Sequence, residues 1–291
     1  DISFVDKSGV VADYVGAGDF SLSDSNLYFS ELKVRSGNAD LYLPRLALLA
    51  DDWHKYQNFM DSVRIEGVSV GSRLDMTTLS NFVPTMWSQI PIELSDLSLT
   101  VVGTVNDFEG EIENVVVNDM ASLSTKFSAV DIEQLADARL ALDGLSLQSE
   151  GSAVCDLYAE ISGKRLSSEA ATIIRRLGVV GVGATVSGLL SDLQGRVALN
   201  TSAGAVEVSA DVAAPRGEYD AHVVARSVDL GRLLAKDNLG KVSLVGDAKS
   251  GRADGDTTAN LLLDISELDF NNHKFSNIAL DANYEKRLVE L

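Results

Sequence analysis

Hydrophobic and polar residues alternate along most of this chain, a pattern that predicts β-strands. The clearest run is 206–212, which reads Val-Glu-Val-Ser-Ala-Asp-Val. Side chains two residues apart share one face of a strand, so this segment has an apolar face and a polar face. Similar alternation predicts short strands within 2–48 and further strands at 63–70, 97–101, 112–117, 140–147, 154–161, 219–225, 242–248 and 261–265.

A six-residue pattern interrupts the alternation: an apolar residue, Ser or Asp, a small or acidic residue, then apolar, any and apolar. Two residues with turn chemistry separate the apolar ones, so we interpret the pattern as a tight hairpin turn. Asp143-Gly144 fits best, because Gly adopts positive φ without steric cost. The pattern predicts one structural unit used repeatedly, with ordinary hairpins of any β-protein as the alternative. It occurs at residues 29–34, 60–65, 94–99, 142–147, 265–270 and 275–280.

Helical signals are few. Ser167 or Ser168 can cap a helix that runs to Leu177 and ends at Gly178. Residues 229–234 predict a short helical insertion, residues 50–60 a loop or short helix, and residues 79–87 a helical turn limited by Pro84. Scarce helical crossovers argue against a parallel α/β sheet. A sandwich, a closed barrel and an elongated open sheet all remain.

The charge balance limits the classes of partner that the protein can bind. The net charge is −19, which argues against nucleic acid and against attachment to anionic membranes, since both need exposed cations. Cys155 is the only cysteine, so no intramolecular disulfide can form, and its alternating neighbours predict a buried strand residue. The longest apolar run, 177–190, is shorter than a membrane span and carries four glycines, so we do not expect a transmembrane helix there. We interpret its glycine-rich part, 178–183, as a flexible or tightly packed connector.

Catalytic and metal-binding patterns are weak. Gly67-Val68-Ser69-Val70-Gly71 has the spacing of a nucleophile elbow, but no firm helix is predicted after Gly71. His54, His222 and His273 lie far apart in the sequence, so we predict no metal site and no cofactor. A hydrolase that uses Ser69 stays as the third hypothesis for function, and we expect a protein that is not an enzyme.

The order of segments in the last third carries a family resemblance. Leu189-Leu190-Ser191-Asp192-Leu193-Gln194-Gly195 precedes the strand pair within 201–212, and segments 219–223, 229–234, 239–244 and 251–263 follow. Earlier, residues 65–69 lead to residues 79–84. In this order the chain resembles the central periplasmic region of the TamB family (translocation and assembly module) of AsmA-like bridging proteins, in the form that occurs in Bacteroides-type bacteria. The resemblance covers most of residues 25–285 and is carried by degenerate hydrophobic patterns.

The resemblance implies a long, twisted antiparallel sheet curved into an open groove, a β-taco, with one or two short helices. It also implies a non-enzymatic bridge that carries phospholipid from the inner to the outer membrane through the periplasm of a Gram-negative bacterium. We then expect an internal fragment of a chain whose inner-membrane anchor lies outside this sequence. Expected partners are phospholipid acyl chains and an outer-membrane barrel protein of the Omp85 type, and nucleic acid is not expected.

We therefore predict one elongated β-rich region over residues 1–291, with an alternative division into 1–90 and 91–291. An assembly factor for outer-membrane barrel proteins and a β-sandwich binding or adhesin module are the competing functions; a compact shape without bound lipid would favour them. The residues predicted to line the groove, chosen by alternation, are Leu97, Leu99, Val101, Leu145, Leu147, Val206, Val208, Val212, Leu261 and Leu263.

Overall fold

The computed structural model describes residues 2–5, 11–75, 91–134, 137–189, 191–253, 256–285 and 288–290. Strands make up 67% of the chain and helices 15%, so the prediction of a mainly β fold is confirmed. The contacts within the chain separate it into unit 1, residues 1–134 and 156–165, and unit 2, residues 135–155 and 166–291. The region 1–291 with its alternative division at residue 90 stays a prediction.

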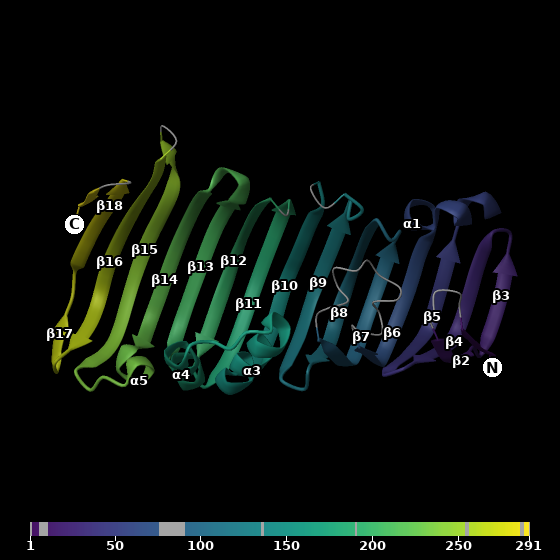
Figure 1. The fold of residues 1–291 in the computed structure, drawn as a ribbon, viewed down its shortest axis with the longest axis horizontal. Coiled ribbons are helices and arrows are strands. Elements are labelled where there is room, and N and C mark those ends of the chain that lie inside the picture. The colour runs from purple at the N-terminus through teal and green to yellow at the C-terminus, as the bar shows by residue number, and fades with distance from the viewer. Residues whose placement is uncertain are drawn as a thin grey trace. The chain divides into compact units, whose positions relative to one another are not determined.

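Unit 1 is an antiparallel sheet in which strands that follow each other in sequence mostly lie side by side (Figure 1). Strands β2 and β3 both pair with β4, along different parts of its length. A 3₁₀ helix, η1 (Trp53–Asn58), and a one-turn helix, α1 (Phe59–Ser62), connect β5 to β6. The strands are β1 Ile2–Val5, β2 Val11–Gly16, β3 Asp19–Ser23, β4 Asn26–Ser36, β5 Ala39–Leu49, β6 Arg64–Asp75, β7 Glu93–Gly103, β8 Asp107–Val117 and β9 Ala121–Val130.

Unit 2 is likewise an antiparallel sheet of consecutive strands, and the chain is not closed into a barrel. Strands β17 and β18 both pair with β16, one after the other. A 3₁₀ turn, η2 (Ala214–Arg216), joins β13 to β14. The strands are β10 Arg139–Glu150, β11 Val179–Leu189, β12 Asp192–Thr201, β13 Gly204–Ala213, β14 Glu218–Asp229, β15 Leu239–Ala253, β16 Asp256–Phe270, β17 His273–Phe275, β18 Ile278–Glu285 and β19 Leu288–Glu290.

The recurring six-residue pattern forms no hairpin turn, so our interpretation is wrong. At 29–34, 94–99, 142–147 and 265–270 it lies within one strand, at 60–65 it runs from α1 into β6, and at 275–280 it joins β17 to β18. Asp143-Gly144 lies inside β10, and the residues on both sides of it pair with the same strand, β11. A two-residue hairpin of the I′ type needs two successive residues at positive φ, as at Asn271-Asn272 between β16 and β17. Four of the six occurrences supply a single such residue, so the chain bulges and continues along the same partner strand. The third residue has φ +49° at Glu31, +52° at Asp96, +63° at Gly144 and +60° at Asn277.

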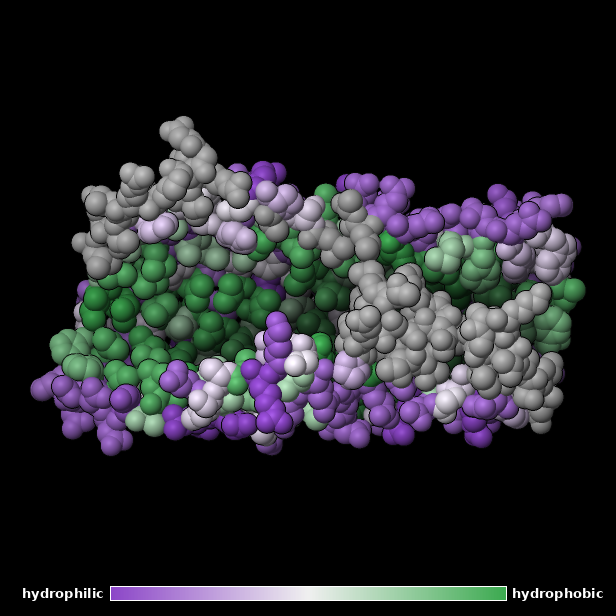
Figure 2. All heavy atoms as spheres, in the orientation of Figure 1, coloured by the Kyte–Doolittle hydropathy of each residue, from purple (hydrophilic) through white to green (hydrophobic). Residues whose placement is uncertain are grey.

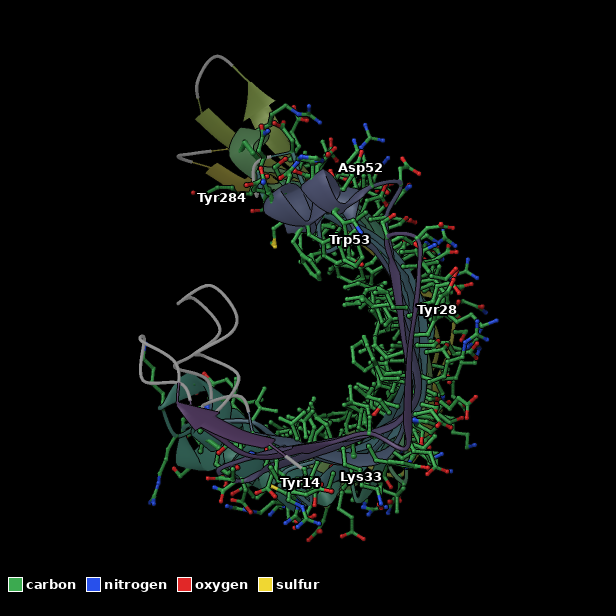
Figure 3. The ribbon with its side chains drawn as sticks, turned by 90° about the vertical axis from the view of Figure 1, so that its right-hand side faces the viewer. Tyr14, Tyr28, Lys33, Asp52, Trp53 and Tyr284 are labelled. Atoms are coloured by element: carbon green, nitrogen blue, oxygen red, sulfur yellow. The ribbon has the colours of Figure 1, made fainter. Side chains whose placement is uncertain are left out.

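These bulges bend the strands of unit 1. Figure 3 looks at the N-terminal edge of that unit, where β4 turns a corner between Tyr28 and Lys33. Glu31 lies between these two residues and holds the positive φ. Carbon-rich side chains fill the inner side of the curve, and oxygen and nitrogen atoms gather on the outer side (Figure 3). A bulge therefore lets each strand curve while its apolar residues stay on the inner face.

Four α-helices occur in the described residues, more than the one or two that we predicted. Helix α4 (Ser168–Arg176) is confirmed: the Ser167 side chain accepts a hydrogen bond from the Ala170 N–H, and Gly178 has φ +71°. Helix α5 (Leu230–Leu234) is also confirmed, with Asp229 as its cap. Helices α4 and α5 lie at the same end of the strands of unit 2 (Figure 1). The helical turn expected at 79–87 lies outside the described residues.

Residues 154–161 belong to a helix, α3 (Gly151–Ser162), so our strand prediction for them was wrong. The apolar residues Val154, Tyr158 and Ile161 also satisfy helical spacing, which short alternation cannot distinguish from a strand. Cys155 is buried as predicted, but on this helix, where its Sγ lies 3.7 Å from the Ala171 carbonyl of α4. A side chain at Gly151 would collide with the Ile174 carbonyl, so the close approach of α3 to α4 requires glycine there.

Candidate functional site

The pairing of the strands in unit 2 places apolar residues in rows that cross eight strands. Each residue of a row is paired directly with the next, so a row lies on one face of the sheet. The first row is Leu147, Val182, Leu199, Val206, Ala225, Leu244, Ile265 and Ile278, and the second is Leu145, Ala184, Val197, Val208, Val223, Gly246, Leu263 and Leu280. The third is Leu142, Val186, Gly195, Ala210, Ala221, Ala248, Leu261 and Ala282.

These three rows define the apolar face of unit 2. Six residues predicted to line a groove lie in them: Leu145, Leu147, Val206, Val208, Leu261 and Leu263. Val212 lies in the next row on the same face, paired with Leu193 and Tyr219. In Figure 2, hydrophobic residues of unit 2, in the left part of the view, line a hollow that hydrophilic residues border along its lower edge.

The apolar face keeps much of its solvent exposure. Every predicted groove residue of unit 2 is only partly buried, and Val197 and Leu280 within the rows remain 38% and 39% exposed. In the described residues, the largest side chains that are fully buried are Val63 and Ser72, both in unit 1. A sandwich buries the inner faces of two packed sheets against each other. The rows in unit 2 therefore form an open surface instead of a closed core.

The opposite face of the same strands is polar. Glu207 lies between Val206 and Val208 and forms ion pairs with Arg196 (3.3 Å) and Arg226 (3.6 Å). A cross-strand hydrogen bond joins His222 to Asp247, and an ion pair joins Lys249 to Asp220, each at 2.8 Å. The hydrogen bond and the charge of Asp220 raise the pKa of Lys249. Alternation along each strand thus separates an ion-paired face from an apolar one.

Unit 1 repeats this division on its own strands. Val101 faces Gly67 and Leu46, because a Cβ at Gly67 would touch side-chain atoms of both. Leu99 pairs with Ile112, and Leu97 is 4% exposed. The polar face carries the ion pair of Lys126 with Glu111 (3.9 Å). The three groove residues predicted in this unit, Leu97, Leu99 and Val101, therefore share one face of β7.

Several residues of the apolar face were missed in the run 177–190, whose part 178–183 was interpreted as a connector. The segment contains strand β11, and Val180, Val182, Ala184 and Val186 alternate along it. Gly181 and Gly183 lie on the polar face, opposite Gln148 and Ser146. The alternation of the valines predicts a strand here. The glycines are also typical of a flexible segment, and for this reason the strand was missed.

Ser69 lacks the setting of a nucleophile elbow. Strand β6 continues through Gly71 to Asp75, so no sharp strand-to-helix turn presents the Ser69 hydroxyl. Ser69 is 5% exposed, and its hydroxyl donates a hydrogen bond to Ser72 Oγ at 2.7 Å. Ser72 Oγ accepts from the Tyr42 N–H at 2.9 Å. The two serines satisfy buried polar groups at the bend of β6, which has φ +58° at Gly71.

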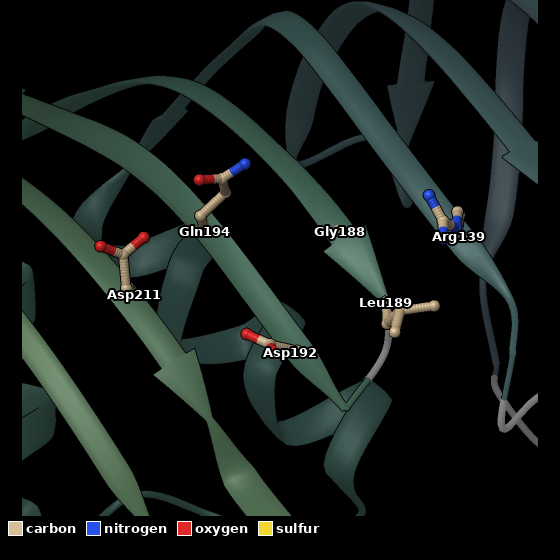
Figure 4. A pocket seen from close by; sticks show the side chains of 6 residues that line it. All are labelled: Arg139, Gly188, Leu189, Asp192, Gln194 and Asp211. Atoms are coloured by element: carbon tan, nitrogen blue, oxygen red, sulfur yellow. The ribbon is translucent and has the colours of Figure 1, made fainter.

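A shallow polar depression of about 470 Å³ lies at one end of the strands of unit 2. Figure 4 shows Gln194 on β12 and Asp211 on β13, with Asp192, Leu189, Gly188 and Arg139 completing the lining. Its lining is mainly polar and does not include the three apolar rows. Among the described residues, no group of three or more His, Cys, Asp or Glu side chains is placed to hold a metal ion.

No protein-family model, curated protein or solved structure matches this chain. Among the described residues, no helix is both long enough and apolar enough to cross a membrane.

Proposed function

We propose that this protein is a non-enzymatic bridge that carries phospholipid through the periplasm of a Gram-negative bacterium, with the acyl chains on its apolar face. The observation that carries the proposal is the open apolar face of unit 2, made of Leu145, Val208, Leu263 and the other residues of the three rows. Monomeric proteins rarely expose contiguous apolar patches of several hundred Å² without a ligand or partner. The family resemblance of the sequence points in the same direction.

The dimensions suit an acyl chain. Eight strands give seven intervals of about 4.8 Å, so each row is about 34 Å long, whereas the hydrocarbon core of a whole bilayer is about 30 Å thick. Each methylene that moves from water to an apolar surface contributes about 0.8 kcal/mol when fully buried. The rows contain apolar residues and glycine only, so an acyl chain that moves along one meets no charged side chain.

The test is native mass spectrometry of the purified protein, followed by organic extraction and lipid analysis. We expect phospholipid at a fixed ratio to protein. Val208→Asp places a charge in the second row and should remove at least about nine tenths of the lipid, because a carboxylate on the path of an acyl chain must be desolvated. Ser209→Asp is the matched control: it adds the same charge one residue later, on the polar face beside Arg196, and should leave the lipid ratio unchanged.

Protein purified without lipid, and unable to take up phospholipid from micelles, would contradict the proposal. Equal loss of lipid in Val208→Asp and Ser209→Asp would also contradict it, since lipid would then not be confined to the apolar face. Circular dichroism of both variants checks that each one folds.

Assembly of outer-membrane barrel proteins is the second candidate, and the edge strand β3 favours it. All five residues of β3 are exposed, including Phe20 (57%) and Leu22 (55%). An exposed edge with apolar side chains can pair with a strand of a partner. Photo-crosslinking from position 22 to an Omp85-type barrel protein, together with the absence of bound lipid, would favour this function over lipid transport.

A further inference from the structure

Five of the six cations described in unit 2 that lack an ion-pair partner lie at one end of its strands. Among the side chains described in this unit, Arg196, Arg216, Arg226, Lys249 and Lys274 each form an ion pair with a carboxylate. Arg139 forms none and lies at the opposite end of the strands, beside the polar depression. The others without such a partner are Arg175, Arg176, Arg232, Lys236 and Lys241.

The helices α4 and α5 bring four of these cations together. Helix α4 ends just before β11 begins, and α5 lies between the end of β14 and the start of β15. In an antiparallel sheet the start of β11, the end of β14 and the start of β15 lie at the same end of the strands. The two helices pack against each other there. Arg176 Nη1 donates to the Leu233 carbonyl, and Arg232 Nη1 donates to the Ser202 carbonyl, each at 2.9 Å. We call Arg175, Arg176, Arg232 and Lys236 the basic rim.

The opposite end of the same strands is rich in carboxylates. Asp192, Asp211, Glu218 and Asp220 line a depression there. The two cations in that lining are engaged: Arg216 pairs with Asp192 and Glu218, and Lys249 with Asp220. The apolar face therefore lies between an end that carries the basic rim together with Asp229, Asp237 and Asp269, and an end whose depression is lined by four carboxylates, with Arg139 nearby. A negative head group of an amphiphile is attracted to the cations of the basic rim and repelled by the carboxylates of the depression.

We propose that the basic rim binds the phosphodiester head group of a phospholipid whose acyl chains lie on the apolar face. This inference rests on the proposed function and adds a head-group site with a fixed orientation. Arg175 and Lys236 are exposed, and their side chains form no hydrogen bond or ion pair in the described structure, so their donors are available to a ligand. An arginine has five N–H donors, so Arg176 and Arg232 keep donors after binding one carbonyl each. Arginine pairs with phosphate through two parallel hydrogen bonds.

Helix capping is the competing explanation for these side chains. Arg175 and Arg176 occupy the last turn of α4, and Arg232 lies in the last turn of α5, where cations stabilise the helix dipole. Capping alone predicts an effect on stability without an effect on lipid choice. The two roles therefore differ in what a measurement of lipid preference would show.

The experiment compares two lipids with identical acyl chains, dioleoylphosphatidylglycerol and dioleoylglycerol, offered from dodecyl maltoside micelles. We expect the phospholipid to bind at least about tenfold more tightly, since charge-assisted hydrogen bonds add to the acyl contacts. The double variant Arg175→Glu/Lys236→Glu should lose this preference and keep its affinity for dioleoylglycerol. The matched control Lys33→Glu/Lys55→Glu makes the same change of charge in unit 1 and should keep the preference.

Each outcome is decisive. Equal binding of the two lipids by the wild-type protein overturns the head-group site and leaves the apolar face intact. Binding of neither lipid overturns the proposed function and with it this inference. Loss of preference in both double variants assigns it to net charge, which also overturns the site. Glycerol 3-phosphate is the probe for a phosphate source without acyl chains: competition by it at concentrations as low as the phospholipid would show that the rim binds free phosphate esters and not lipid.

Discussion

Leu142 and Leu145 lie three residues apart in β10, yet they point to the same face of the sheet. Their partners on β11, Val186 and Ala184, are two residues apart, so those partners share a face by simple alternation. The extra residue on β10 is absorbed at Asp143-Gly144, where Gly144 has φ +63°. The bulge thus bends the strand without turning its apolar residues toward the polar side.

This relationship predicts that residue 144 must tolerate the left-handed region. Gly144→Ala should lower the free energy of unfolding by about 1–2 kcal/mol, because the methyl group has room but the backbone conformation is strained. Gly144→Asn should cost less, since Asn tolerates this region. The measurement is urea denaturation of each variant.

Gly181→Ala is the control for this prediction. Gly181 lies in β11 without a positive φ, and the nearest atom to a Cβ there would be the Asn200 carbonyl oxygen at 3.7 Å. Alanine should therefore be neutral or slightly stabilising at this position. A larger loss at 181 than at 144 would contradict the bulge.

The two serines at the bend of β6 should differ in their effect on stability. Ser72→Ala leaves the Tyr42 N–H and the Ser69 hydroxyl without their acceptor in a buried place, which costs about 1–3 kcal/mol. Ser69→Ala removes a single donor and should cost about 1 kcal/mol or less. Thermal denaturation measures both. A larger effect of Ser69→Ala would mean that Ser69 has a role beyond this pair of hydroxyls.

The Tyr56 hydroxyl connects η1 to the sheet through hydrogen bonds. It should make the free energy of unfolding depend on pH at alkaline pH. The hydroxyl oxygen lies 3.0 Å from the Ser25 carbonyl oxygen and 3.1 Å from that of Leu48. Burial raises the pKa of Tyr56 above 10.0, so the folded state holds the proton more firmly than the unfolded state. The contribution is complete below pH 10 and is lost as the pH rises through the folded pKa.

The matched variant is Tyr56→Phe, which should cost about 0.5–1.5 kcal/mol at neutral pH. Denaturation at several pH values should show a steeper loss of stability above pH 10 in the wild-type protein than in Tyr56→Phe. Parallel curves for the two proteins would show that Tyr56 is not protected by the fold.

Two valines on β11 and β13 test whether the apolar face is open. Val180 is 4% exposed, and Val180→Ala should cost about 2 kcal/mol through lost burial and a small cavity. Val208 is only partly buried, so Val208→Ala should cost at most about 1 kcal/mol. Urea denaturation compares the same substitution within one unit. Equal costs would mean that the apolar face is a closed core.

The fold class could be predicted from the sequence because alternation alone decides which side chains share a face. The run at 206–212 is an example: its partners on β12 and β14 are apolar where it is apolar. The bends could not be predicted in this way. Asp143-Gly144 has the composition of a hairpin turn, and whether one residue or two adopt positive φ depends on the neighbouring strand as well as on local chemistry.

Two local interpretations failed because patterns overlap. Residues 154–161 satisfy both strand and helix spacing, and only the packing of Cys155 against α4 distinguishes them. The glycines at 181 and 183 lie on the polar face of β11, where they leave the alternation of its valines intact. The basic rim was missed for a third reason: Arg175 and Lys236 are far apart in sequence and come to the same end of the sheet through the packing of α4 on α5.

The most direct test of the proposed lipid path is position-specific photo-crosslinking to a radiolabelled phospholipid. A photoreactive phenylalanine analogue is placed singly at 206, 208, 261 and 263 on the apolar face, and at 207, 209 and 262 on the polar face. We predict crosslinked lipid at the first four positions and none above background at the other three. Equal labelling of both sets, or labelling confined to 207, 209 and 262, would contradict a lipid path on the apolar face.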